Sequence, residues 1–219
     1  MGRLALREDE IELFRRRLCD IATRRFAELG VAGVSLRGLA DELGCSRATP
    51  YRYFQNKDEI FAAVRARAFA QLAAACDEAT ALEPHAERRL MAIGHAYLRF
   101  ARDEPHAYRV AFELDQPDVE KYPELLRARA TAWGAMREAV EHAFLEGMLE
   151  GDPETISHLY WAGLHGLAAL ELAGQLQSRT LDELEGPMIE ALLRGTRIAT
   201  RAHDSVARPF HTDPSEKSP

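Results

Sequence analysis

The sequence predicts an all-α protein of about nine helices. Apolar residues recur every three or four positions along most of the 219-residue chain, and no segment shows the strict alternation typical of a strand. Residues that favour helix starts, such as Ser, Asn and the pair Asp-Pro, precede these runs, and Gly often follows them. These observations predict a small N-terminal group of three helices joined to a larger helical body.

Four helices are predicted in the first 80 residues, at 11–29, 36–43, 47–54 and 57–80. Gly30 and Gly44 end the first two, because glycine readily adopts the left-handed conformation that closes a helix. Ser35 and Ser46 precede the second and third helices as N-caps, and Asn56 opens the fourth with a pattern that resembles a capping box.

Five further helices are predicted at 86–103, 105–114, 124–146, 153–176 and, starting near Gly186-Pro187, to about residue 199. Pro105 and the pair Asp152-Pro153 mark helix starts. The segment 115–123 contains two prolines and is predicted to be a loop. The polar tail at 204–219 is predicted to be disordered.

The net charge of −7 argues at first against a nucleic-acid partner, but the charge is unevenly distributed. Residues 1–60 carry 11 basic and 10 acidic side chains, whereas residues 61–219 carry 17 basic and 25 acidic ones. The acidic excess therefore belongs to the C-terminal part, which we expect to face away from a DNA backbone. DNA binding has to be judged from the positions of individual basic side chains.

The three cysteines, Cys19, Cys45 and Cys76, lack a metal-binding spacing. We expect them to be small buried thiols in a reducing compartment, with a thiol sensor as the alternative. The N-terminus shows no apolar run of signal-peptide length, and no run of about 18 apolar residues is present. We therefore expect a cytoplasmic protein with no membrane partner.

Residues 35–57, SLRGLADELGCSRATPYRYFQNK, carry the clearest functional pattern. A short helix, a glycine turn and a second short, capped helix are typical of a helix-turn-helix, in which the small Ala40 lets the helices approach closely. The second helix would then place its N-terminal side chains in a major groove. A plain helical hairpin with a solvated, charged face is the alternative.

Ten side chains of this segment are predicted to contact DNA, namely Ser35, Arg37, Ser46, Arg47, Ala48, Thr49, Tyr51, Arg52, Tyr53 and Lys57. Arg47 and Arg52 can bind guanine or phosphate, and Thr49 can contact a base. Ser35, Ser46 and Lys57 lie at helix N-termini, where free N–H groups and the helix dipole favour a phosphate.

A wider set of positions resembles the N-terminal domain of TetR/AcrR-type transcriptional repressors over residues 10–62, namely Phe26, Gly30, Ser35, Leu39-Ala40, Gly44 and the run YRYFQNKDEIF at 51–61. The resemblance implies a three-helix DNA-binding domain whose third helix is the recognition helix. It also implies that Ser35 and Lys57 face phosphate, that Tyr51 is the aromatic residue of the DNA-binding motif, and that Tyr53 is an exposed aromatic residue.

Cys45 and Pro50 depart from the family pattern, because Val is common at the first position and Leu or Ile at the second. With Ser46 as the N-cap, Pro50 is the fourth helical residue, and it lacks the N–H of the first intrahelical bond. We expect a tightened or bent first turn of the recognition helix and an altered angle in the groove.

The segment WAGLHGLAALELAG at 161–174 resembles the Trp-x-x-x-His-Gly class of C-terminal ligand-binding domains in the same family, and PHAYRVAF at 105–112 is loosely similar. The resemblance implies that the last two large helices form a homodimer through a four-helix bundle. The interface residues we expect are Gly163, Leu164, Gly166, Leu167, Leu170 and Leu192. The alternative is a monomer that packs these helices in its own core.

The helices between would enclose a pocket for a small-molecule effector of unknown identity. Its candidate lining residues are Tyr97, Phe100, Tyr108, Phe112, Trp133, Met136, Trp161 and His165. Plain core packing is the alternative for each of them.

Patterns typical of catalysis or metal binding, such as HExxH, GxSxG or a Gly-rich phosphate loop, are absent from the sequence. We therefore expect no enzyme activity, no cofactor and no metal. The sequence predicts a DNA-binding domain at 1–56 and a ligand-binding and dimerisation domain at 57–203. The predicted function is a homodimeric repressor that leaves a palindromic operator when an effector binds. A helical small-molecule binding protein or enzyme, or a regulator switched by a protein partner or a thiol, are the alternatives.

Overall fold

A computed structural model describes residues 8–114 and 118–206, and within these ranges the chain forms eight α-helices, two short 3-10 helices and no strand. The predicted all-α fold is confirmed. In chain order the helices are α1 (Glu8–Gly33), α2 (Leu36–Leu43), η1 (Pro50–Arg52), α3 (Lys57–Thr80), α4 (Ala86–Asp103), α5 (Pro105–Phe112), η2 (Val119–Lys121), α6 (Pro123–Leu145), α7 (Pro153–Leu172) and α8 (Leu181–Val206).

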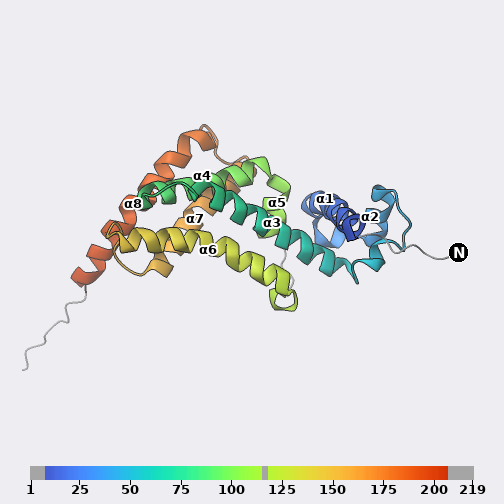
Figure 1. Cartoon of the computed structure of the whole chain (residues 1–219). Helices are drawn as coiled ribbons and strands as arrows, with labels where there is room; N and C mark the ends of the chain where they lie inside the picture. The colour runs from blue at the N-terminus through green and yellow to red at the C-terminus, as the bar shows by residue number, and fades with distance from the viewer. Residues whose placement is uncertain (1–7, 115–117, 207–219) are drawn as a thin grey trace, which may run out of the picture.

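The molecule is elongated, with α1, α2 and the start of α3 at one end and the helical body at the other (Figure 1). Helix α3 runs from the small group into the body, where it packs against α6 and α4. Helices α7 and α8 pack against each other at the far side of the body. None of the helices within the described ranges is long and apolar enough to cross a membrane.

The buried residues form two hydrophobic clusters. The N-terminal core gathers Leu18, Cys19, Ala22, Phe26, Ala27, Val34, Leu36, Leu39, Phe54, Ile60, Phe61, Val64 and Val110. The body core contains Phe69, Leu72 and Cys76 of α3 together with residues of α4 to α8. Helix α3 therefore contributes to both cores, and α5 sends Val110 into the N-terminal core.

Local backbone chemistry sets the turn between α1 and α2. Gly30 has a positive φ of 69° and interrupts α1, and Gly44 closes α2 with a φ of 71°. Ser35 caps α2, because its hydroxyl accepts a hydrogen bond from the Gly38 N–H at 3.1 Å. The predicted roles of these three residues in ending and starting helices are confirmed.

The α-helix predicted at 47–54 is wrong in type. Residues 46–54 form a turn followed by the 3-10 helix η1, with hydrogen bonds from Thr49 N–H to Ser46 O at 2.8 Å and from Arg52 N–H to Thr49 O at 3.1 Å. Pro50 has no N–H to donate to the Ser46 carbonyl, so the first bond of an α-helix cannot form there. The effect of Pro50 therefore exceeds the tightened or bent first turn that we expected, because the whole predicted α-helix is replaced by a turn and a 3-10 helix.

The last helix begins earlier than predicted. Thr180 and Glu183 exchange hydrogen bonds, because the Thr180 N–H donates to the Glu183 carboxylate at 2.9 Å and the Glu183 N–H donates to the Thr180 hydroxyl at 3.3 Å. This reciprocal cap starts α8 at Leu181 and leaves Pro187 inside the helix. Helix α8 continues to Val206, so residues 204–206 are helical and not part of a disordered tail; residues 207–219 of that predicted tail lie outside the described residues.

Replacement of Gly44 by alanine should lower the free energy of unfolding by about 1–2 kcal/mol, because an L side chain is strained at this left-handed φ. Gly134 of α6 is a matched control. A Cβ there meets no atom within 4 Å, so Gly134→Ala should raise the free energy of unfolding by up to about 1 kcal/mol. Urea unfolding of both variants measures the two effects, and a Gly44→Ala protein as stable as the wild type would contradict the prediction.

Candidate DNA interface and ligand cavity

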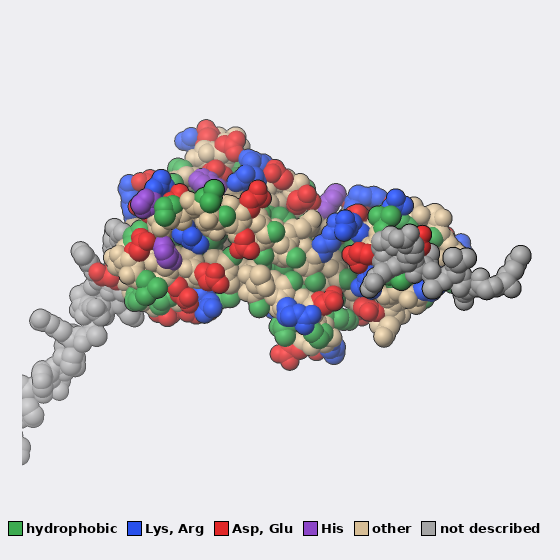
Figure 2. Space-filling view, viewed as in Figure 1, with side chains coloured by type: hydrophobic (Ala, Val, Ile, Leu, Met, Phe, Trp, Pro, Cys, Tyr) green, Lys and Arg blue, Asp and Glu red, His purple; other side chains and the backbone are tan. Residues whose placement is uncertain are grey.

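Seven of the ten side chains predicted to contact DNA are exposed at the end of the molecule that holds α2 and η1, namely Ser35, Arg37, Ser46, Arg47, Ala48, Tyr51 and Arg52. Tyr51 is the most telling of them, because 61% of this large aromatic side chain is exposed. Figure 2 shows several basic side chains, with acidic ones among them, over the N-terminal helices in this view, and a mixture of acidic and basic side chains over the body. The arrangement offers a polar, partly basic surface with one exposed ring.

The other three predicted contact residues are half-buried and already have partners. The Tyr53 ring packs on Phe14 with the ring centroids 4.6 Å apart, so it does not project as an exposed aromatic residue, and that expectation is corrected. The Thr49 hydroxyl lies 2.8 Å from that of Ser46, which leaves Ser46 without its predicted capping bond. The Lys57 ammonium donates to the Val31 carbonyl at 2.7 Å and ties the start of α3 to the end of α1.

Ion pairs fix α2 against α1. The Glu42 carboxylate accepts hydrogen bonds from both Arg24 and Arg25, and the bond from Arg25 is the main cause that lowers the pKa of Glu42. Arg47 lies 3.4 Å from Asp41, in an exposed contact that a phosphate can readily replace. The ion pairs of Glu42 thus hold α2 on α1. The Arg47 side chain takes no part in them and is mostly exposed.

A cavity of about 490 Å³ lies in the body between α3, α4, α5, α6 and α7. Six of the eight predicted pocket residues line it: Tyr97, Phe112, Trp133, Met136, Trp161 and His165. Phe100 does not line it but packs in the body core, 5% exposed, so its assignment is corrected. Tyr108 does not line it either, so that assignment is also corrected: it is fully buried behind the wall, where it packs on Phe112 and contacts His165.

His165 is held by two tyrosines. Its Nδ1 atom lies 3.0 Å from the Tyr97 hydroxyl and 2.7 Å from the Tyr108 hydroxyl. Burial lowers the pKa of His165, so the ring is neutral at pH 7. In the tautomer in which Nδ1 accepts a hydrogen bond from a tyrosine hydroxyl, the ring proton is on Nε2. The Nε2–H group can then donate a hydrogen bond to a ligand in the cavity.

Arg65 of α3 also lines the cavity, although it is only 3% exposed. One guanidinium nitrogen donates to the Ala111 carbonyl at 3.3 Å, at the end of α5. Burial and, second, the charge of Arg129 lower its pKa to about 10, so Arg65 still carries its charge at pH 7. Arg65 is absent from the residues predicted for the cavity, although its spacing indicates a buried position: it lies four residues from both Phe61 and Phe69, on the apolar face of α3.

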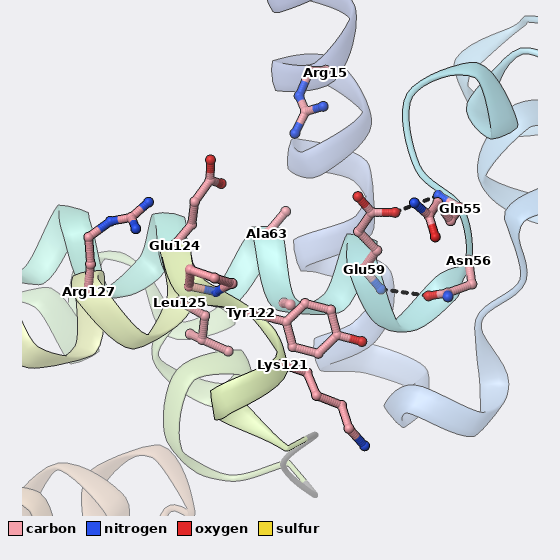
Figure 3. A pocket seen from close by; sticks show the side chains of 12 residues that line it. Arg15, Gln55, Asn56, Glu59, Ala63, Lys121, Tyr122, Glu124, Leu125 and Arg127 are labelled. Carbon is pink, nitrogen blue, oxygen red and sulfur yellow. Dashed lines mark hydrogen bonds between the residues drawn. The ribbon is translucent and has the colours of Figure 1, made fainter.

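A second hollow, of about 600 Å³, lies where the first turns of α3 face the start of α6 (Figure 3). Its walls carry charges of both signs, including Glu59, Lys121 and Glu124. The Glu59 N–H donates to the Asn56 side chain at 2.9 Å, and this bond caps α3. The hollow lies between the N-terminal helices and the start of α6. Its wall mixes charged, polar and apolar side chains, whereas the walls of small-molecule sites are mostly apolar.

The six predicted dimer residues separate into three groups, which are buried, half-buried and exposed. Leu164 and Leu167 are 0% and 3% exposed within one chain, so their assignment to an interface is corrected: they belong to the body core. Gly163 faces Leu192 of α8 in the same chain, and Leu192 is half-buried. Gly166 and Leu170 are exposed, Leu170 by 48%.

Cys19 and Cys76 are buried, as expected, whereas Cys45 is only half-buried. Burial raises the pKa of Cys19 to about 11 and that of Cys76 to about 12, so both thiols stay protonated at pH 7. Thiolates are the reactive form, and these two positions therefore do not favour a thiol switch. Across the described residues, no three His, Cys, Asp or Glu side chains come together in a group that could hold a metal ion.

Comparison with known proteins identifies the family. Residues 18–64 match the family model described as "Bacterial regulatory proteins, tetR family", and residues 90–195 match "Tetracyclin repressor-like, C-terminal domain". A curated relative, the uncharacterized HTH-type transcriptional regulator Rv1255c of Mycobacterium tuberculosis, is 31% identical over 147 residues, which cover 66% of this chain and 68% of the relative. This chain belongs to the TetR family of regulators.

Two more comparisons extend over most of this TetR-family chain. The HTH-type transcriptional regulator Rv1816 of M. tuberculosis is 24% identical over 203 residues and covers 79% of this chain and 86% of its own length. A solved structure of a protein of unknown function from Rhodococcus sp. RHA1 superposes with a TM-score of 0.73 at 27% identity, over 84% of this chain and 95% of that one. The protein is a TetR-family transcriptional regulator with a helix-turn-helix, whereas its membership of the narrower Trp-x-x-x-His-Gly class stays a prediction.

The stability of this TetR-family protein should depend on the protonation of His165. Because burial lowers the pKa of His165 in the folded protein below the ordinary histidine value of about 6.5, the unfolded chain binds the proton more readily. The free energy of unfolding should therefore fall, relative to that of His165→Gln, as the pH is lowered through 6.5 towards 5. Urea unfolding of both proteins across this pH range tests the prediction, and an equal pH dependence in the two would contradict it.

Proposed function

We propose that this protein is a ligand-responsive, homodimeric transcriptional repressor. In this proposal the surface around η1 binds a palindromic operator, and a small molecule in the 490 Å³ cavity releases it. A cavity of this volume lies within the range of small-molecule sites, and its walls are mainly apolar and aromatic.

The observation that carries the proposal is the position of α5 between the cavity and the N-terminal core. The Ala111 carbonyl is bound by Arg65, which lines the cavity, while Val110, one residue earlier, is fully buried in the N-terminal core. Phe112, one residue later, lines the cavity. A ligand that displaces Arg65 or Phe112 would shift α5 and with it Val110, which packs in the N-terminal core. The position of α5 therefore supports coupling between the cavity and the DNA-binding surface.

DNA binding should depend on Arg47 more than on a matched arginine elsewhere. Arg47→Ala should weaken binding to an operator duplex by about tenfold or more, because a base or phosphate contact is lost at the exposed end of the molecule. Arg137 of α6 is the control, since it is also exposed and paired with one carboxylate, and Arg137→Ala should bind like the wild type. The operator is first selected from a random duplex library, and gel shifts then measure the affinities.

The salt dependence separates phosphate contacts from structural effects. Lys57→Ala should reduce the slope of log affinity against log salt by about 1 if the Lys57 ammonium binds phosphate in addition to Val31. Failure of the wild type to select any duplex would contradict the proposed function and favour a helical binding protein without a DNA role.

Exposed apolar surface on α7 supports the proposed homodimer. Leu159 and Leu170 are 47% and 48% exposed, and the small residues Ala162 and Gly166 lie between them on the same face, because the four are three or four positions apart. A Cβ at Gly166 would meet no atom of its own chain within 4 Å, so a partner helix can approach closely there.

Leu170→Arg should shift the protein from dimer to monomer, because it places a charge in the proposed apolar contact. Leu145 at the end of α6 is 82% exposed and serves as the control; Leu145→Arg should remain dimeric. Analytical ultracentrifugation distinguishes the two states. A monomeric wild type, or a dimeric Leu170→Arg, would exclude this face as the interface.

A further inference from the structure

The cavity contains a buried positive charge that has no acidic partner among the described residues. Arg65 is 97% buried, and its Nε and one terminal nitrogen have no hydrogen-bond partner among the described residues. Its one hydrogen bond goes to a neutral carbonyl, that of Ala111. A buried guanidinium is unfavourable unless it is paired, so this arrangement is incomplete without a further acceptor.

The surroundings of Arg65 add positive charge instead of balancing it. Arg129 of α6 lines the same cavity, and its charge disfavours the protonated state of Arg65. The guanidinium carbon otherwise lies 5.7 Å from the ring centre of Phe69 and 5.9 Å from that of Phe61, contacts that stabilise a cation only weakly. Two arginines at one cavity with no carboxylate among its lining residues create an anion-attracting end.

The rest of the cavity wall is mainly apolar and aromatic. Phe69 and Phe112 lie between Arg65 and His165, with their ring centres 5.4 Å apart, and Phe112 lies 5.4 Å from the His165 ring. Trp133 and Trp161 complete the aromatic wall. A ligand that fits this site needs an apolar part for the aromatic wall and a negative group for Arg65.

We propose that the effector is an apolar acid whose carboxylate, or similar anionic head, binds the Arg65 guanidinium while its apolar part fills the cavity. The Nε and Nη1 groups of Arg65 have N–H donors without partners among the described residues, and a carboxylate supplies both the negative charge and the acceptor oxygens that such donors need. Arg129 provides a second positive charge near the head. This inference rests on the proposed function, because it assigns the chemical class of the molecule that would release the operator.

The test compares three probes with the same ten-carbon chain and different heads, namely decanoate, decanamide and decylamine. The only two tryptophans of the chain, Trp133 and Trp161, both line the cavity, so intrinsic fluorescence reports its occupation directly. We expect the wild type to bind decanoate at least about tenfold more tightly than decanamide, and decylamine most weakly. This comparison uses only the wild-type protein and does not depend on the folding of any variant.

Variants then locate the head group. Arg65→Met should bring the affinities for decanoate and decanamide to within about threefold of each other, whereas Arg65→Lys, which keeps the charge, should retain part of the preference. Arg127 lies two residues before Arg129 on α6 but lines the other hollow, so Arg127→Gln is the matched control for Arg129→Gln. Only Arg129→Gln should weaken decanoate binding.

Equal affinity of the wild type for decanoate and decanamide, no binding of decanoate, or a preference that survives in Arg65→Met would each overturn the proposal. Gel shifts with the selected duplex separate this outcome from a failure of the proposed function. A protein that binds the duplex but does not distinguish the heads contradicts only the effector class. A protein that selects no duplex contradicts the proposed function, while the fluorescence comparison still decides the chemistry of the cavity.

Discussion

The structure depends above all on helix α3, which is shared by two hydrophobic cores. Its first turns bury Ile60, Phe61 and Val64 in the N-terminal core, and its later turns bury Phe69 and Leu72 in the body core. A close-packed helix cannot move at one end without disturbing the packing at the other. The orientation of the helix-turn-helix is therefore set by how α3 packs in the body.

Helix α5 adds a second connection, and Arg65 lies where the two connections meet. The side chain starts on α3, crosses the cavity wall and binds the last turn of α5. Burial of an incompletely paired guanidinium disfavours the folded state, whereas an apolar side chain at this position would pack without that penalty. An anion bound in the cavity would explain why a charged side chain occupies this position. The contact between Arg65 and the Ala111 carbonyl would then transmit the effect of ligand binding to both α3 and α5.

The predictable parts of the fold follow from local chemistry. Ser35, Gly30 and Gly44 act through their own backbone and side-chain hydrogen bonds, so their roles could be inferred from single positions. The sequence also predicts that Pro50 disturbs the recognition helix, but the effect is larger than a bend, because the loss of one N–H at the start of a very short helix removes a large share of its hydrogen bonds. The pair Gly186-Pro187 predicts too late a start for α8, because the reciprocal Thr180–Glu183 cap already starts the helix at Leu181.

The sequence by itself determined the all-α class, the order of the helices, the helix-turn-helix and most of the aromatic residues that surround the cavity. These features depend on periodicity, capping and residue size, which are local. Only the tertiary structure decided which side chains are buried, which are exposed and which have a partner. It placed Leu164 and Leu167 inside one chain and Gly166 on its surface, and it packed Tyr53 on Phe14 while leaving Tyr51 exposed. It also buried Arg65 with no acidic partner in the part of the chain that the structure describes. Local spacing places Arg65 on the apolar face of α3, but burial and pairing also depend on residues far apart in the chain, so the local pattern alone does not determine them.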